Sequence, residues 1–254
     1  MTTSIVTGGG RGIGRATALA LADAGHAVAV LARSRPQIDE TVQLIQRAGG
    51  TALAIPVDVA DPASVTEAVR VSEQSLGRCD VLVNIAAVNG PIALTGDIEP
   101  TAWDELFRIN LTGTFLMCQA VLPAMIEAGH GRILNTISGL ASRVQPGLAA
   151  YSASKAAVAH FSAVLAAEYA EQGISAFAVN PGIVKTALLN ELIGLPNADA
   201  AQNHVTSRMH SDTVRDMMLQ PEESAALYRR IAAGELDDRN GQVVSVYDES
   251  LNTA

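Results

Sequence analysis

Apolar and polar positions alternate along the chain in blocks whose lengths suit strands and helices in turn. Apolar runs of strand length lie at residues 4–7, 27–32, 51–57, 81–84, 132–137, 174–179 and 242–246. Segments with helical spacing or helix-boundary residues lie between them, at 12–24, 35–50, 62–76, 101–128 and 151–172. Strands that are apolar throughout are buried on both faces, and their alternation with helices indicates a parallel sheet. We predict an α/β fold: a Rossmann-type, doubly wound parallel sheet of about seven strands in a three-layer α/β/α arrangement.

Several residues mark helix boundaries, and one long segment interrupts the alternation of strands and helices. Asp61-Pro62 predicts an N-cap followed by proline at the first helical position. The stretch from Thr101 to Asp104 resembles a capping box, and Pro123 predicts a kink or a separate last turn in the helix that follows. Residues 1–254 form one predicted domain, in which residues 186–220 have no long periodicity. We expect this segment to be a substrate-binding loop or lid, or else a short helical pair packed on the surface.

Composition narrows the class of protein. Hydrophobic residues make up 48% of the 254 residues and the mean hydropathy is +0.23, but polar residues or glycine interrupt every apolar run, so no membrane span is expected. The net charge of -9 argues against nucleic acid or anionic membranes as partners. Cys79 and Cys118 fit no disulfide framework and, like the five histidines, no metal spacing. Because a strand begins almost at once, leaving no room for a signal peptide, we expect a cytoplasmic protein.

A glycine-rich turn joins the first predicted strand to the first predicted helix. Thr7 is followed by Gly8, Gly12 and Gly14 in the spacing Gly-x-x-x-Gly-x-Gly. Glycines at such a turn let a diphosphate approach the backbone N–H groups at a helix N-terminus. The spacing differs from Gly-x-Gly-x-x-Gly, and the turn has no Gly-Lys-Ser/Thr of a P-loop. Its place between strand and helix predicts a dinucleotide-binding turn.

Arginines near the expected ribose indicate which dinucleotide is preferred. In such sites an acidic residue at the end of the second strand binds the ribose 2′-hydroxyl, whereas arginine accommodates a 2′-phosphate. Here Arg33 and Ser34 occupy that position, Arg11 lies in the glycine turn, and Asp39 is the first acid. Guanidinium groups favour a phosphate dianion. We predict NADP(H) in preference to NAD(H), the alternative being that Arg33 and Arg35 are solvated surface charges.

Tyr151 and Lys155 are four residues apart at the start of a predicted helix. At that spacing the two side chains lie on one face. A nearby cation lowers the pKa of a phenol from about 10 toward the range useful for proton transfer at neutral pH. Taken alone, Tyr-x-x-x-Lys is a short motif that occurs by chance, so its meaning depends on the rest of the chain.

Together these motifs resemble the classical short-chain dehydrogenases/reductases over nearly the whole chain. The matching positions are Thr7 to Gly14, Asp58-Val59, Asn110, Ser138, Tyr151, Lys155, and Asn180-Pro181-Gly182 followed by Thr186. One motif differs from the family pattern: this chain has Asn84-Ile85-Ala86-Ala87 where the family has Asn-Asn-Ala-Gly. We expect this change to weaken a hydrogen bond beneath the sheet or to crowd the backbone near the ribose.

The resemblance implies hydride transfer between nicotinamide C4 and a carbonyl or alcohol carbon. Tyr151 would exchange a proton with the substrate oxygen, and Ser138 would donate a second hydrogen bond to it. Lys155 would hold the ribose and tune Tyr151, while Asn110 would anchor a water that links Lys155 to solvent. The expected cofactor-binding residues are Gly8, Gly10, Arg11, Gly12, Ile13, Gly14, Arg33, Ser34, Asp58, Val59, Asn84, Ala86, Tyr151, Lys155, Pro181, Gly182, Val184 and Thr186. The expected substrate-binding residues are Ser138, Leu140, Val144, Tyr151, Ile183 and Leu188.

The sequence therefore predicts an NADP(H)-dependent oxidoreductase with an apolar to moderately polar substrate, such as a ketone, a 3-oxoacyl group or a cyclic alcohol. The segment 186–220 has no ring of Lys or Arg that would indicate a multiply charged substrate. The alternatives are a non-catalytic NADP(H)-binding regulator of the same fold, and a lyase or epimerase, which would need a longer chain. The helix after Tyr151 is small or apolar almost all round, so we also expect a homodimer or homotetramer.

Overall fold

The computed structural model describes residues 1–251, and its centre is one sheet of seven parallel strands. The strand order is β3-β2-β1-β4-β5-β6-β9, which confirms the predicted fold class. The strands are β1 (Thr3–Thr7), β2 (Ala27–Ala32), β3 (Thr51–Pro56), β4 (Val81–Asn84), β5 (Gly131–Thr136), β6 (Ile174–Asn180) and β9 (Val243–Ser245). The order reverses between β1 and β4, and ligands of open α/β sheets bind outside the carboxyl ends of the strands at such a point.

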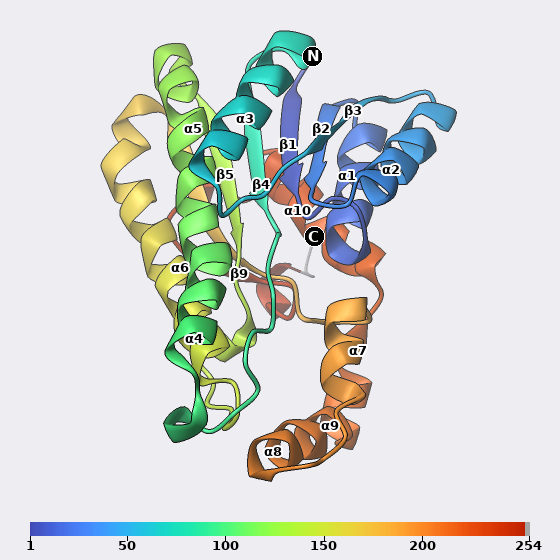
Figure 1. The fold of residues 1–254 in the computed structure, drawn as a ribbon. Helices are drawn as coiled ribbons and strands as arrows, with labels where there is room; N and C mark the ends of the chain where they lie inside the picture. The colour runs from blue at the N-terminus through green and yellow to red at the C-terminus, as the bar shows by residue number, and fades with distance from the viewer. Residues whose placement is uncertain (252–254) are drawn as a thin grey trace.

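Helices cover both faces of the sheet (Figure 1). One layer is α1 (Gly12–Asp23), α2 (Arg35–Arg47) and α10 (Pro221–Ala232), and the other is α3 (Pro62–Leu76), α5 (Gly113–Ala128) and α6 (Ala149–Tyr169). Each layer packs a separate apolar cluster against the sheet, with Leu21, Ile38 and Ile231 on the first side and Val65, Met117 and Leu165 on the second. The sequence pattern predicted these helices to within about two residues at most ends, apart from α10.

The long helix before β5 differs from the prediction. It starts with α4 (Pro100–Phe107), so Thr101 lies inside the first turn, and its N-cap, Glu99, makes no side-chain capping bond. Proline suits the first helical position, which explains why the helix begins one residue earlier than expected. Pro123 lies within α5, and the irregularity is instead the π-helical turn Arg108–Thr112.

The combined helix Pro100–Ala128 is the most apolar stretch against which to test the expectation of no membrane span. Its 29 residues contain a window with mean hydropathy 1.5, so by length and composition alone it could cross a membrane. Gly113 interrupts the stretch, and Glu127 is the one charged residue of α5. A helix that covers a sheet passes the same test, and 44% of this window is buried inside the protein.

Residues 186–220 form short helices beyond the carboxyl edge of the sheet (Figure 1). They comprise α7 (Ala187–Ile193), α8 (Ala200–Met209) and α9 (Asp212–Asp216), and the strand β8 (Met218–Leu219) pairs in parallel with β7 (Ile183–Val184). Side chains of Thr186, Asp199 and Ser211 each accept a backbone N–H as the N-cap of one helix. Capping therefore fixes the helix starts in a segment whose hydrophobic spacing gives little signal.

Candidate active site

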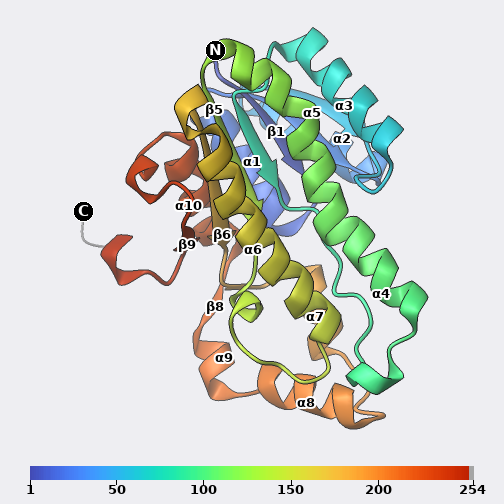
Figure 2. The ribbon, with the colours of Figure 1, turned by 90° about the vertical axis from the view of Figure 1, so that its left-hand side faces the viewer.

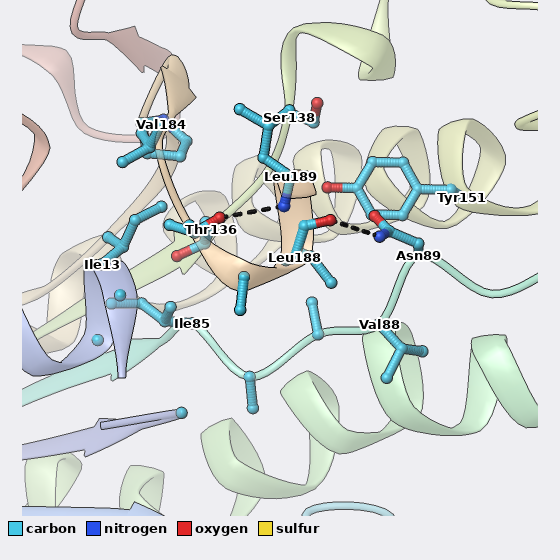
Figure 3. Close-up of a pocket in the computed structure, with 18 of the residues that line it drawn as sticks. Ile13, Ile85, Val88, Asn89, Thr136, Ser138, Tyr151, Val184, Leu188 and Leu189 are labelled. Atoms are coloured by element: carbon cyan, nitrogen blue, oxygen red, sulfur yellow. Dashed lines mark hydrogen bonds between the residues drawn. The ribbon is translucent and has the colours of Figure 1, made fainter. Parts of the chain in front are cut away.

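A cavity of about 650 Å³ opens at the carboxyl ends of the strands, between the sheet and α7 (Figure 3). Its lining includes all the predicted cofactor-binding residues except Asn84, and all the predicted substrate-binding residues except Val144. The fold therefore brings together side chains from the glycine turn, β2, β5, α6 and the segment after β6. Cavities of this size accommodate cofactors and small organic molecules.

The glycine turn forms a cradle with no room for side chains. Gly8 has φ +68°, and a Cβ there would lie 3.0 Å from the backbone nitrogen of Ala86. A Cβ on Gly14 would overlap the carbonyl oxygen of Gly8. The open space lies at the N-terminus of α1, whose free N–H groups suit a phosphate. The cradle thus fits the diphosphate of a dinucleotide.

The Asn84-Ile85-Ala86-Ala87 loop is held by its backbone. The hydroxyl of Thr7 accepts the backbone N–H groups of Ile85 and Ala86, at 3.0 and 3.2 Å. These bonds do not depend on the side chain at position 85, so the departure from the family motif leaves them intact. Asn84 is buried below the cavity, where its amide nitrogen donates to the side-chain oxygen of Asn135 at 2.9 Å. This burial explains why Asn84 does not line the cavity.

The end of the cavity beside the glycine turn is lined by two arginines. Arg11, Arg33 and Ser34 line it together with Asp58 and Val59. Within residues 1–251 neither Arg11 nor Arg33 forms an ion pair. Arg35 differs, because its guanidinium holds Asp39 at 2.8 Å and it does not line the cavity. The lining arginines are thus available to an anionic ligand.

Ser138, Tyr151 and Lys155 all line the cavity, and Figure 3 shows the first two. Lys155 is 3% exposed, and its ammonium donates to the carbonyl oxygen of Thr136 at 2.8 Å. Its nitrogen lies 5.9 Å from the centre of the Tyr151 ring. The helix spacing expected from the sequence has therefore brought the phenol and the amine to one face.

Burial controls the pKa values of this pair. It lowers the pKa of Lys155 to about 8, since the charged ammonium is poorly solvated there. Burial also raises the pKa of Tyr151, and the Ser138 side chain opposes that shift by a smaller amount. This direction is opposite to the one expected from the sequence, in which Lys155 would lower the pKa of Tyr151, because burial disfavours the charged phenolate.

Asn110 lies behind the cavity wall and does not line it. It is fully buried in the π-helical turn, where its side chain accepts from Val88 N at 2.9 Å and donates to Val88 O at 3.0 Å. A further bond joins its amide to the hydroxyl of Ser154 at 3.3 Å. These bonds fix the β4 loop against α6, which is a positioning function.

Val144 is the third predicted site residue that does not line the cavity, after Asn84 and Asn110. Its side chain is 88% exposed, on the loop between β5 and α6. The neighbouring Arg143 lines the cavity instead, as does Arg208 of α8. No local pattern predicts either arginine, because each reaches the cavity only through the path of its loop or helix.

Tyr247 and Asn89 also line the cavity, and the sequence analysis did not predict them. The Tyr247 hydroxyl donates to the carbonyl of Met217 at 2.6 Å and accepts from the backbone nitrogen of Ile183 at 2.8 Å. The Asn89 amide donates to the carbonyl of Leu188 at 2.8 Å (Figure 3). Both side chains thereby tie the rim of the cavity to the segment that carries α7, α8 and α9.

Comparison with known proteins agrees with this geometry. The family described as short chain dehydrogenase matches residues 2–194. The chain is 39% identical over 245 residues to the short-chain reductase protein NovJ of Streptomyces niveus, with 96% of this chain and 91% of NovJ covered. It is 38% identical over 194 residues to a 3-oxoacyl-[acyl-carrier-protein] reductase of Synechocystis sp., with 76% of this chain and 78% of that protein covered.

A solved structure is similar over the same extent. It is a 7α-hydroxysteroid dehydrogenase complexed with NADH and 7-oxo glycochenodeoxycholic acid, with a TM-score of 0.86 and 26% identity. The match covers 96% of this chain and 92% of the dehydrogenase. The chain therefore belongs to the short-chain dehydrogenase family, whose members are oxidoreductases that bind a nicotinamide cofactor and act on small molecules.

Proposed function

We propose that the protein is an NADP(H)-dependent oxidoreductase that interconverts a carbonyl compound and a secondary alcohol. The observation that carries the proposal is the joint presence of Ser138, Tyr151 and Lys155 in the wall of a cavity that also contains the glycine cradle. A bound nicotinamide cofactor would supply or accept the hydride. The residues of the chain would position the substrate oxygen and handle its proton.

Tyr151 is the proposed proton donor during reduction. Its raised pKa keeps the phenol protonated at neutral pH, which suits donation to an oxygen that gains negative charge. Ser138 supports that oxygen with a second hydrogen bond. Lys155 is anchored through Thr136 and points its charge toward the same region, where it can also hold cofactor hydroxyls. In the oxidative direction Tyr151 would act as the phenolate and receive the proton that the alcohol hydroxyl loses.

The preference for NADP(H) rests on Arg11 and Arg33. Both line the adenosine end of the cavity and have no carboxylate partner within residues 1–251. A ribose 2′-phosphate would supply two negative charges there, whereas a 2′-hydroxyl would leave two guanidinium groups unpaired. The one solved relative described above contains NADH, so the preference belongs to these two residues and not to the family as a whole.

The segment 186–220 is the proposed substrate lid of a single catalytic domain. Leu188 and Leu189 line the cavity, and Leu189 belongs to an apolar cluster that also contains Leu192, Met209 and Tyr151. Leu140 and Ile183 extend the apolar lining, which suits the hydrocarbon part of a ketone, a 3-oxoacyl group or a cyclic alcohol. We also infer a cytoplasmic location, in keeping with the buried free thiols of Cys79 and Cys118.

The function is tested by following the absorbance of NADPH with a panel of ketones and 3-oxoacyl thioesters. Tyr151→Phe should lower kcat by about 10²- to 10⁴-fold while cofactor affinity is retained. Tyr169→Phe removes a hydroxyl from the far end of α6 and should leave kcat unchanged. A Tyr151→Phe variant as fast as the wild type would refute the proton-donor role.

A non-catalytic NADP(H)-binding regulator remains the second candidate function. It would use the same cradle and the same Arg11 and Arg33, which binding alone requires. The retention of Ser138, Tyr151 and Lys155 in one cavity favours the enzyme, because a binding protein needs no proton donor there. NADPH binding without turnover of any compound in the panel, by wild-type protein, would favour the regulator.

A further inference from the structure

The cavity is cationic although the protein carries a net charge of -9. Among residues 1–251 its charged lining consists of Arg11, Arg33, Arg143, Lys155 and Arg208, with Asp58 as the single carboxylate. Arg11, Arg33 and Lys155 are explained by the proposed cofactor. Arg143 and Arg208 are not, because they come from the β5–α6 loop and from α8, on the substrate side of Tyr151.

Neither of these two guanidinium groups has a partner in the part of the chain that the structure describes. Most arginines in this acidic protein do, as the bonds from Arg70 to Glu67 and from Arg132 to Asp237 illustrate. Six arginines within residues 1–251 form no ion pair, and four of the six line this cavity. The six are Arg11, Arg33, Arg47, Arg143, Arg208 and Arg229. The concentration of unpaired guanidinium groups in one cavity indicates anionic ligands.

Arg143 lies beside the proposed reaction centre. Its guanidinium carbon is 4.0 Å from the position that a Cβ on Gly139 would occupy, and Gly139 directly follows Ser138. The side chain also approaches Tyr247, where its positive charge opposes the rise that burial causes in the pKa of the Tyr247 hydroxyl. Arg143 is therefore within the wall that holds the substrate, and Tyr247 ties that wall to the lid.

Arg208 enters the cavity from the lid. The next residue, Met209, is buried in an apolar cluster with Leu148 and Leu192, against which Tyr151 packs. This packing fixes the last turn of α8 over the cavity. Arg208 is itself half-buried, so its charge faces the cavity lining and not open solvent alone.

Apolar side chains fill the lining near these two arginines. They are Leu140, Leu148, Leu188, Leu189, Leu192 and Met209. The lining thus offers an oxygen site at Ser138 and Tyr151, an apolar surface, and two unpaired guanidinium groups. A ligand that matches all three features has a carbonyl or hydroxyl, a hydrocarbon part and an anionic oxygen group.

We propose that Arg143 and Arg208 bind an oxyanionic group, a carboxylate or a phosphate, carried by the substrate. Guanidinium groups form bidentate, charge-assisted hydrogen bonds to both anions. The inference deepens the proposed oxidoreductase function and rests on it. Of the two arginines, the segment 186–220 supplies Arg208 and the β5–α6 loop supplies Arg143.

Matched pairs of compounds test the proposal. One pair is a linear keto acid and its methyl ester, and the other is a 3-oxoacyl thioester of phosphopantetheine and the same thioester of pantetheine, which lacks only the phosphate. With NADPH, the wild type should show a kcat/KM higher by about 10- to 100-fold for the anionic member of at least one pair. The first pair reports a carboxylate and the second a phosphate, so the source of the anion is identified.

Arg143→Gln and Arg208→Gln should each remove most of that preference, because each lowers kcat/KM for the anionic member more than for the neutral member. Arg229→Gln is the matched control, because Arg229 is exposed on α10, unpaired and outside the cavity. It should retain the full preference. Equal rates for both members of each pair, or a preference unchanged in both cavity variants, would overturn the assignment.

Binding separates this inference from the proposed function. Calorimetry on NADPH-loaded Tyr151→Phe should show the keto acid or the phosphopantetheine thioester binding about tenfold or more tightly than its neutral partner. The additional Arg143→Gln change should abolish that difference. Arginine-dependent anion binding without turnover by the wild type would support the inference and refute the oxidoreductase. Equal turnover of the anionic and neutral members would support the oxidoreductase and refute the inference.

Discussion

At the scale of single residues, Lys155 shows how the site depends on burial. An ammonium that is 3% exposed has one protein partner in the described chain, the carbonyl of Thr136. Its pKa falls from 10.5 to about 8, so below pH 8 the folded protein must bury a charge that the unfolded chain leaves in water. Keeping this cation beside Tyr151 therefore lowers the free energy of unfolding.

This burial makes a prediction about stability. Between about pH 8 and 10.5 the unfolded state binds more protons at Lys155 than the folded state, so this group's contribution to stability rises with pH. Relative to Lys155→Met, the wild type should gain about 3 kcal/mol in the free energy of unfolding across that range. Urea unfolding of both proteins at several pH values measures the difference. A constant difference would show that the lysine is not desolvated.

Arg33 decides the proposed cofactor preference. Arg33→Asp places a carboxylate beside the ribose, where it would repel a 2′-phosphate and accept a hydrogen bond from a 2′-hydroxyl. The ratio of kcat/KM for NADPH to that for NADH should fall by about 10- to 100-fold. Arg47→Asp, on the exposed end of α2, serves as the control for the change in net charge. An unchanged ratio would remove Arg33 from the cofactor site.

At the scale of elements, the sequence predicted the parts of the fold whose signal is local. The apolar runs of β1, β2 and β4 are buried on both faces. The glycine turn contains a residue with positive φ, Gly8, which is a conformation that favours glycine. The helices α7 and α9 have seven and five residues, too few for a hydrophobic period to emerge. Their positions depend on tertiary contacts, including those of Asn89 and Tyr247 far away in the sequence.

Tyr247 tests the connection between the rim and the lid. Tyr247→Phe removes the hydroxyl that bridges Met217 and Ile183 while it keeps the ring. Each lost hydrogen bond is worth about 1 kcal/mol, so we expect KM for the carbonyl substrate to rise about three- to tenfold with a smaller change in kcat. Steady-state kinetics measures both constants, and Tyr169→Phe is again the control. A change in kcat alone would place Tyr247 in the chemical step.

At the scale of the whole molecule, one surface remains apolar. Phe115, Ile126 and Val164 are 38–42% exposed on α5 and α6, which run side by side in Figure 2. Phe115 also contacts Phe161 of α6, with ring centres 6.2 Å apart. An apolar face shared by two adjacent helices suits association with a second copy about a two-fold axis.

We therefore expect a homodimer or homotetramer, and Phe115→Lys should shift it toward monomer. Light scattering after gel filtration gives the mass directly. Leu44→Lys is the matched control, since Leu44 is an apolar residue of similar exposure, 37%, on α2. A monomeric wild-type protein at micromolar concentration would contradict the expectation. The sequence indicated this surface because α6 is apolar almost all round, but it could not say which residues face outward.

The candidate site combines predicted and unpredicted residues for a physical reason. Ser138, Tyr151 and Lys155 were predictable because they share spacing within one segment of the chain. Arg143, Arg208 and Tyr247 meet the cavity only after loops and lid helices have folded, and no short-range pattern encodes that meeting. The proposed cofactor preference therefore rests on residues that the sequence predicts, Arg11 and Arg33. The proposed class of substrate rests on residues that only the folded cavity reveals, Arg143 and Arg208.

Transfer of the hydride itself is the most direct test of the proposed function. The wild type is incubated with NADPH deuterated at C4, on the transferred face, and with a ketone or keto acid that supports turnover. Mass spectrometry then locates the label in the product. We predict one deuterium on the new carbinol carbon, and a much slower appearance of that product with Tyr151→Phe. Cofactor bound to the protein with no deuterium in any product would contradict the proposal.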